Sequence, residues 1–193
     1  MVKAFFHSGF MLKSLNHTFI TLIPKVPNLE KVTQFRPIAL CNVTYKIISK
    51  ILVNRLKPFM DSLITPFQNA FIQGRQITDN IILVKEFFEY LKKKKEGKWG
   101  FVALKLDMNK AYDRINWNFL IAVLERMGFS QTWVNWITQC VTTVSYSVLI
   151  NGSPSDSFIP ARGLRQGRIL IHLSSLCKCF VLCPSETRNI ITP

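Results

Sequence analysis

Apolar residues recur about every four positions over residues 42–63, and this spacing predicts the clearest helix of the chain. Pro58 lies inside the stretch and predicts a kink or an end, because proline lacks a backbone N–H and clashes with the preceding turn. We therefore expect the helix to kink or end near Pro58, close to the C-terminal end of this stretch. The apolar positions that follow the helical period are Ile47, Ile48, Ile51, Leu52, Leu56 and Phe59.

Other stretches combine helical spacing with capping residues. Helices are expected over 2–12, from Thr78 or Asp79 to about Lys95, from Asn116 to Gly128, and from Ser130 onward. In the helix that starts near Thr78, the residues expected inside are Ile81, Ile82, Val84, Phe87, Phe88 and Leu91. The four lysines at 92–95 suit a helix C-terminus, whose dipole favours cations. A solvated helix end therefore competes with a nucleic-acid site as the interpretation of this run.

Strand patterns alternate with these helices. They lie over residues 18–23, 38–40, 101–106 and 144–150. Asn151-Gly152 predicts a hairpin turn, after which 157–160 returns beside the preceding strand. Prolines and polar residues predict loops over 25–37 and 65–76. This mixture of strands and helices predicts an α+β fold.

Composition narrows the class of partner. The 193 residues are 48% hydrophobic, which is enough for a core, and their net charge of +14 favours a polyanion such as nucleic acid, nucleotide phosphates or an anionic membrane. A solvated basic surface is the alternative. No apolar run is long enough to span a membrane. Five cysteines without a secretory signal predict an intracellular protein, nuclear or cytoplasmic, that is not secreted.

One acid stands at the end of a predicted strand. The strand over 101–106 runs directly into Asp107, and an aromatic residue, Tyr112, follows five positions later. In a strongly basic chain this placement favours nucleotide chemistry. Two alternatives stay open from the residues alone: Asp107 caps the next turn, or it pairs with Lys110 or Arg114.

The stretch FVALKLDMNKAYDRINW resembles the first catalytic motif of the reverse transcriptases of non-LTR (LINE-type) retrotransposons, particularly the plant kind. The segments NHTFITLIPK, FRPIAL and QNAFIQGRQITDN resemble the preceding finger and palm blocks, in the same order. ARGLRQG resembles the start of the next motif, so the resemblance covers residues 2–167. It implies RNA-directed DNA synthesis, with an RNA template, a DNA primer and deoxynucleoside triphosphates as partners. An RNA–DNA hybrid is the partner expected of this chain.

The resemblance also implies roles for single residues near the chemistry. Asp107 would bind two catalytic Mg²⁺ ions, with the carbonyl of Met108 helping one of them, since Mg²⁺ prefers oxygen ligands. The ions would activate the primer 3′-hydroxyl and stabilise the leaving pyrophosphate. Tyr112 would exclude a 2′-hydroxyl from beneath the sugar, and Asp113 is expected to hold the turn. Ordinary core packing is the alternative for Tyr112.

Further residues would hold the nucleotide and the template. Lys25 and Arg36 resemble the finger residues that hold the triphosphate, and Gln166 resembles the residue near the templating base pair. The block that touches the template contains Gln68, Phe71 and Arg75. Two alternatives are a surface charge fixed by Pro37, in the case of Arg36, and an ion pair with Asp79, in the case of Arg75.

After Gly167 the sequence departs from the family pattern. Arg168-Ile169-Leu170-Ile171-His172 stands where the family has Asp-Pro-Leu-Ser-Pro, and no two of the chain's eleven acids are adjacent, so the Asp-Asp box is absent. We expect a partial right-hand polymerase with fingers and an incomplete palm, lacking the Asp-Asp hairpin and the thumb. The expected divisions are 1–98 for the fingers-like part with the first palm helices, 99–167 for the partial palm and 168–193 for a non-homologous or frame-altered tail.

Three functional outcomes follow from this departure. Because metal catalysis needs several converging anionic ligands, the sequence predicts a reverse transcriptase domain that is inactive alone. A non-catalytic, basic nucleic-acid-binding fragment and a non-functional pseudogene product are the alternatives. The tail adds a zinc site as a minor alternative, although its C-x-C-x₃-C spacing lacks the usual knuckle. The four ligands of that site would be His172, Cys177, Cys179 and Cys183.

Overall fold

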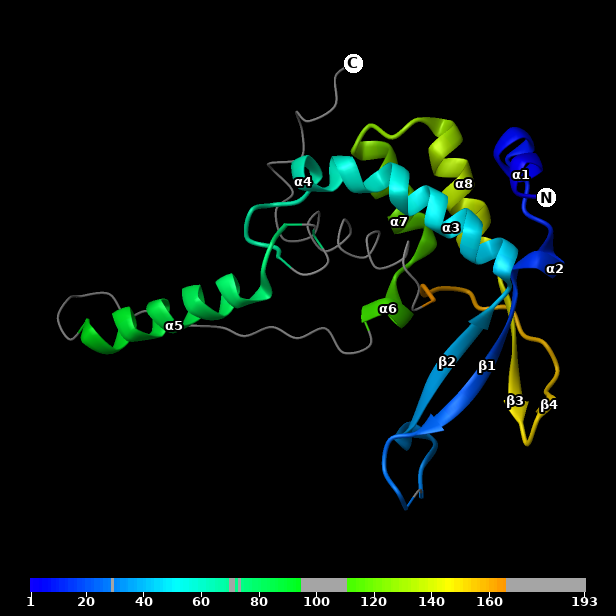
Figure 1. Ribbon diagram of the computed structural model, residues 1–193, viewed down its shortest axis with the longest axis horizontal. Coiled ribbons are helices and arrows are strands. Elements are labelled where there is room, and N and C mark those ends of the chain that lie inside the picture. The colour runs from blue at the N-terminus through cyan, green and yellow to red at the C-terminus, as the bar shows by residue number, and fades with distance from the viewer. Residues whose placement is uncertain (29, 70–71, 73, 95–110, 166–193) are drawn as a thin grey trace.

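A four-stranded sheet forms the lower part of the computed structural model (Figure 1), which describes residues 1–28, 30–69, 72, 74–94 and 111–165. The strand order is β2-β1-β3-β4. β1 (His17–Pro24) runs antiparallel to β2 (Phe35–Cys41) and parallel to β3 (Ser145–Ile150), which pairs with the short β4 (Ser153–Pro154). This mixed sheet with helices confirms the α+β fold class.

The β1–β2 hairpin confirms one predicted strand and lengthens another. The strand expected over 18–23 is present as β1, whereas the short strand expected over 38–40 begins earlier and includes Arg36 and Pro37. Pro37 pairs with Leu22 in the ladder. Because β2 is at the edge of the sheet, a proline that cannot donate a hydrogen bond is tolerated there.

Helix α3 (Val43–Leu56) confirms the helical period after position 42. The Asn42 side chain caps it by accepting a hydrogen bond from the Thr44 backbone N–H at 2.9 Å. At Pro58 the chain tightens into a 3₁₀ turn, η2 (Lys57–Phe59), and continues as α4 (Met60–Leu63). Ile48, Leu52 and Leu56 are buried as expected, but Ile47 and Phe59 are exposed, since the kink and the outer face turn them towards solvent.

Helices from both ends of the described chain enclose the core. α1 (Val2–Ser8) and α2 (Lys13–Asn16) replace the single helix expected over 2–12, because Gly9 ends α1 in a left-handed conformation. α7 (Trp117–Arg126) and α8 (Gln131–Thr142) begin at the predicted caps Asn116 and Ser130. Their apolar faces meet α3 in one cluster, whose fully buried members include Ile48, Leu52, Leu56, Leu120, Leu124 and Ile137. The sequence predicted a boundary between a part at 1–98 and a part at 99–167. The sheet and this cluster each contain residues from both parts.

Helix α5 (Ile77–Lys93) extends away from the core (Figure 1). Its N-cap is Gln76, two residues before the first predicted cap, Thr78, and the Gln76 side chain makes no capping bond. The expectation that its apolar residues lie inside is wrong: no residue of α5 is buried, and Ile81 is 64% exposed. The helical period therefore predicted the helix correctly but not its burial.

The Asn151-Gly152 turn forms as predicted, with positive φ at both residues. The returning segment pairs with β3 earlier than expected, through β4, and then meets it again at a bridge between Tyr146 and Phe158. A short helix not anticipated from the sequence, α6 (Ala111–Arg114), precedes α7. The strand expected over 101–106 and the tail after Arg165 lie outside the described residues. Within the described part, no helix is long and apolar enough to cross a membrane.

Candidate functional site

The end of the β1–β2 ladder brings two predicted nucleotide-binding residues together. Arg36 lies opposite Ile23, and Lys25 directly follows the last pair of the ladder, Pro24 with Phe35. Both side chains are exposed. The Lys25 ammonium donates to the Thr33 carbonyl at 2.9 Å, which holds the lysine against the loop beside Arg36. Two cations therefore share one end of the hairpin, an arrangement suited to an anionic ligand.

A pocket of about 300 Å³ is lined by Pro37, the residue that directly follows Arg36. One wall is β-structure, formed by Ile20 and Pro37–Ala39, and the other includes Asp113 and Tyr146. The remaining wall of the pocket is the segment that includes Arg162, Gly163 and Arg165. The pocket therefore lies between the β1–β2 hairpin and α6, the helix that includes Tyr112, and its lining carries both a carboxylate and guanidinium groups.

Gly163 joins this pocket wall to the start of α7. Its backbone N–H donates to the Ile115 carbonyl at 2.8 Å, and its carbonyl accepts from the Trp117 indole N–H at 2.8 Å. Gly163 has φ +90°, and a Cβ atom at this position would lie 3.0 Å from the Asp113 carbonyl oxygen. Only glycine fits such an approach without displacing the backbone. The contact fixes the chain just after Tyr112.

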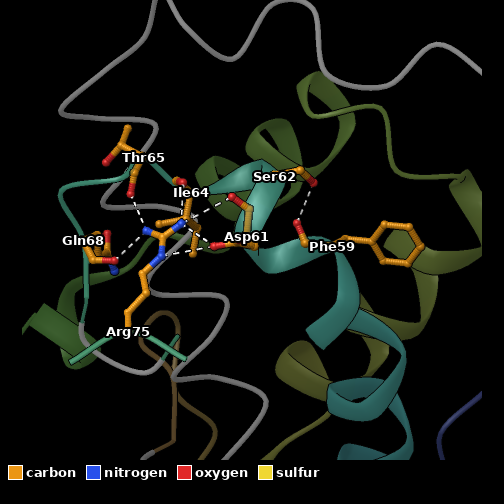
Figure 2. Close-up of polar contacts among 7 residues, drawn as sticks. All are labelled: Phe59, Asp61, Ser62, Ile64, Thr65, Gln68 and Arg75. Carbon is orange, nitrogen blue, oxygen red and sulfur yellow. Dashed lines mark hydrogen bonds and ion pairs between the residues drawn. The ribbon is translucent and has the colours of Figure 1, made fainter. Parts of the chain in front are cut away.

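Arg75 organises the loop between α4 and α5 (Figure 2). Its guanidinium pairs with Asp61 at 2.5 Å and donates to the carbonyl oxygens of Thr65 at 2.6 Å and Gln68 at 2.9 Å. The pairing with Asp79 that the sequence allowed is therefore replaced by one with Asp61, because the loop folds back towards α4. The structure brings Gln68 and Arg75 together, and Arg75 acts there on the chain's own carbonyl groups.

Several predicted site residues cannot be placed in this geometry. Asp107, Met108, Phe71 and Gln166 lie outside the described residues. Tyr112 belongs to α6, but the structure describes only its backbone. Among the described residues, no three histidine, cysteine or acidic side chains gather as a metal site. The ligand role of Asp107 therefore stays a prediction, and so does the role of Asp113 in holding the turn.

A buried guanidinium that the sequence pattern did not indicate lies in the wall of the pocket. Arg165 is 7% exposed and donates to Thr18 Oγ1 at 2.6 Å, to Asn16 Oδ1 and to the Cys140 carbonyl at 3.3 Å. Its Cζ atom lies 3.9 Å from the centre of the Tyr45 ring, a cation–π contact. Nothing in ARGLRQG separates this residue from the exposed Arg162, so pattern alone gave no signal for it.

Burial around Arg165 changes the acid–base chemistry of its neighbours. Desolvation raises the pKa of the Cys140 thiol to about 12 and that of Tyr146 to about 12, while the charge of Arg165 acts in the opposite direction. Burial likewise raises the pKa of Tyr45 above its usual range. The hydroxyl of Tyr45 has no hydrogen-bond partner among the described groups. These side chains therefore stay neutral near pH 7, and none of them supplies an anion to Arg165.

The comparison with protein families identifies the chain. Residues 23–175 match the family model described as "Reverse transcriptase (RNA-dependent DNA polymerase)". The match covers most of the chain, and the chain therefore belongs to the reverse transcriptase family. It runs past Gly167, the position where the sequence departs from the family's next motif.

Individual relatives come from non-LTR retrotransposons. Over 84% of the chain, it is 29% identical to the transposon TX1 uncharacterized 149 kDa protein of Xenopus laevis. It is 25% identical, over 76% of the chain, to a Pol polyprotein from a type-1 retrotransposable element R2 of Popillia japonica. A type-2 R2DM polyprotein of Drosophila melanogaster is 26% identical over 75% of the chain. The chain spans 12%, 20% and 13% of the lengths of these relatives.

Proposed function

We propose that this chain carries the nucleotide- and template-binding part of a non-LTR retrotransposon reverse transcriptase, and that its ligand is an RNA template paired with a DNA primer. The observation that carries the proposal is the shared position of Lys25 and Arg36 at one end of the β1–β2 ladder. Both are exposed, and the pocket wall of Pro37–Ala39 follows directly. A triphosphate bound by these cations would have its sugar and base near the pocket.

In this proposal each residue of the pocket has one task. Lys25 attracts the triphosphate as a point charge, whereas Arg36 offers a planar fork that two phosphate oxygens accept. Tyr112 lies under the sugar and excludes a 2′-hydroxyl. Gln166 lies near the templating base pair. The contacts of Gly163 with Asp113 and Trp117 support this arrangement, since they fix the backbone that follows Tyr112.

The template side of the proposal involves Gln68, Phe71 and Arg75. The guanidinium of Arg75 already donates to Asp61, Thr65 and Gln68. We therefore assign Arg75 an indirect role, in which it holds the loop that presents Gln68 and Phe71. The further bond from Asn69 to Asn80 at 2.9 Å ties the same loop to α5.

Enzymes of this family use Mg²⁺, and we assign its binding to Asp107 with the carbonyl of Met108. One carboxylate and one carbonyl are suitable donors, but they are fewer than two ions require. When bound, the metal lowers the barrier to attack by the primer hydroxyl. Asp113, the acid that lines the pocket, belongs to α6, and we assign it a structural role here. No further ligand is assigned.

We expect no primer extension from this chain alone, because its sequence has no adjacent pair of acids. We also propose that the chain derives from a plant-type element and that its frame is disrupted after Gly167. In this proposal, 1–98 corresponds to the fingers-like part with the first palm helices, and 99–167 corresponds to the partial palm. Primer extension by a parent-length element tests the role of Asp107. Asp107→Ala should abolish extension, and unchanged extension would remove Asp107 from the metal site.

Binding of an RNA–DNA hybrid tests the proposal on the chain itself. Fluorescence anisotropy at several salt concentrations should give an affinity that falls steeply with salt, because phosphate contacts release counterions. Arg36→Ala and Lys25→Ala should each lower the magnitude of the salt slope by about one. Lys3→Ala is the matched control, since it removes an equal charge from the exposed face of α1.

Two results would contradict the proposal. A flat salt response would show that the net charge of +14 makes no productive phosphate contacts. An equal effect of Lys3→Ala and Arg36→Ala would show general charge attraction without a site. The alternative of a non-functional product predicts in addition that urea unfolding of the purified chain lacks a cooperative transition.

A further inference from the structure

Helix α3 carries a row of three lysines along its exposed side. Lys46, Lys50 and Lys57 are all exposed, and Lys57 continues the helical backbone as the C-cap of α3. At 3.6 residues per turn, steps of four and eleven residues from Lys46 return to nearly the same side of the helix. With a rise of about 1.5 Å per residue, the three positions cover about 16 Å along the helix axis. We call these three residues the α3 lysine row.

The α3 lysine row has no acidic counterpart in its own part of the chain. Residues 31–60 contain six lysines and arginines and no acid, since Glu30 and Asp61 are the acids on either side. Within the described residues, none of the three lysines pairs with a carboxylate. The lysines of α5, by contrast, share their helix with Glu86 and Glu89. The charge of the row is therefore available to an anionic partner.

The remaining cation of α3 has a different environment. Arg55 lies nine residues after Lys46, which places it on the opposite side of the helix. Its guanidinium carbon lies 5.2 Å from the centre of the Phe6 ring and 5.7 Å from that of the Trp136 ring. Arg55 therefore packs on the aromatic side chains of α1 and α8, whereas the α3 lysine row points to solvent.

Two kinds of polyanion offer a dense array of charge: a nucleic-acid duplex and an anionic membrane surface. A helix that binds a membrane surface inserts a broad apolar face between the lipids. The apolar face of α3 is instead buried in the core, and Val43 and Ile47 are its only exposed large hydrophobic residues. A duplex needs no such face, because its phosphates follow one another at about 3.4 Å per strand along a stiff axis. A straight row of lysines over about 16 Å therefore fits a duplex better than lipid.

We propose that the α3 lysine row is a further binding surface, for the phosphate backbone of a nucleic-acid duplex. The three ammonium groups act as point charges and displace counterions from the duplex. Contacts of this kind read no sequence, so the row supplies affinity and orientation but no specificity. The surface is separate from Lys25 and Arg36, which lie at the end of the β1–β2 ladder away from α3 (Figure 1). It therefore goes beyond the proposed function.

Fluorescence anisotropy with a short labelled RNA–DNA hybrid tests the proposal. The variant carries Lys46→Gln, Lys50→Gln and Lys57→Gln together, which removes three charges and keeps residues of similar helix propensity. The slope of log affinity against log salt concentration should fall in magnitude by about 3, because each lost phosphate contact removes about one. The affinity at about 0.1 M salt should fall more than about tenfold.

A matched control separates the row from charge in general. Lys85→Gln, Lys92→Gln and Lys93→Gln together remove the same charge from three exposed lysines of α5, and should change the slope by less than about one. Replacing the α3 lysine row by three arginines keeps its charge and should retain both slope and affinity. If the triple glutamine variant fails to unfold cooperatively in urea, the single glutamine variants decide, each with an expected loss of about one in the slope.

Three results would overturn this inference. An unchanged salt slope in the row variant would show that the lysines touch no phosphate. Equal losses in the row variant and the α5 control would show general charge attraction. Binding to phosphatidylserine vesicles that depends on the row, with hybrid binding unchanged, would assign the surface to a membrane.

The same measurements separate this inference from the proposed function. Hybrid binding that depends on Arg36 but not on the α3 lysine row overturns only the further surface. Hybrid binding that depends on the row but not on Arg36 supports the further surface and removes the site at the β1–β2 ladder.

Discussion

Replacing Gly163 with alanine tests the junction between the pocket wall and α7. An added Cβ atom would lie 3.0, 3.1 and 3.2 Å from the carbonyl oxygen, Cα and carbonyl carbon of Asp113. These are backbone atoms, so no side chain can rotate away to relieve the contact. The φ angle of +90° adds a second cost for any residue with a Cβ atom.

The magnitude follows from these two costs. A left-handed backbone costs a non-glycine residue about 1–2 kcal/mol. Overpacking against a fixed neighbour costs about 1–3 kcal/mol more. Gly163→Ala should therefore lower the free energy of unfolding by about 2–5 kcal/mol, a large part of the roughly 5–15 kcal/mol typical of a domain. Urea unfolding followed by far-UV circular dichroism measures this loss.

Gly152→Ala is the matched control for the backbone cost. Gly152 has φ +83°, and nothing lies within 4 Å of an added Cβ atom. This variant should lose only the conformational part, about 1–2 kcal/mol. The excess loss in Gly163→Ala then measures the contact with Asp113. Equal losses in the two variants would refute the close approach of residues 113 and 163.

Two further predictions concern the loop and the buried thiol. Arg75→Ala should lower the free energy of unfolding by about 1–3 kcal/mol, because it removes bonds to Asp61, Thr65 and Gln68. Asp61→Asn should cost less than about 1 kcal/mol, since this side chain is 77% exposed; an equal loss in both variants, measured by urea unfolding, would contradict the importance of the carbonyl bonds. Burial raises the pKa of Cys140 from 9.0 to about 12, so the unfolded thiol ionises first and the free energy of unfolding should fall as pH rises from about 9 to 12. Cys140→Ala should reduce that slope by at most about 1.4 kcal/mol per pH unit, and an unchanged slope would show that the thiol ionises equally in both states.

Local features of the fold were predictable because their causes are local. Asn42, Asn116 and Ser130 each cap a helix with their own side chain, and this needs only the next few residues. Pro58 and the Asn151-Gly152 turn act in the same way. Such features depend on backbone chemistry that neighbouring residues determine.

Features that depend on distant residues were not predictable from the pattern. The period of α5 does not reveal whether the rest of the fold covers its apolar face, and in the described structure no residue of it is buried. Arg75 pairs with Asp61, fourteen residues earlier, because a loop reverses direction between them. Arg165 is buried while Arg162 is exposed, and this difference depends on how distant segments of the chain pack around Arg165. The family motifs predicted the candidate site residues but not these contacts.

The parallel pairing of β1 with β3 has a consequence for the order in which the chain is synthesised. His17 and Ser145 lie side by side although they are 128 positions apart. β2 can pair with β1 once Cys41 has left the ribosome, but the other edge of β1 stays open until Ser145 follows, roughly 5–20 s later at ordinary synthesis rates. An open strand edge is a template for pairing with other chains. The yield of folded protein therefore depends on events during translation, before the residues that complete the sheet exist.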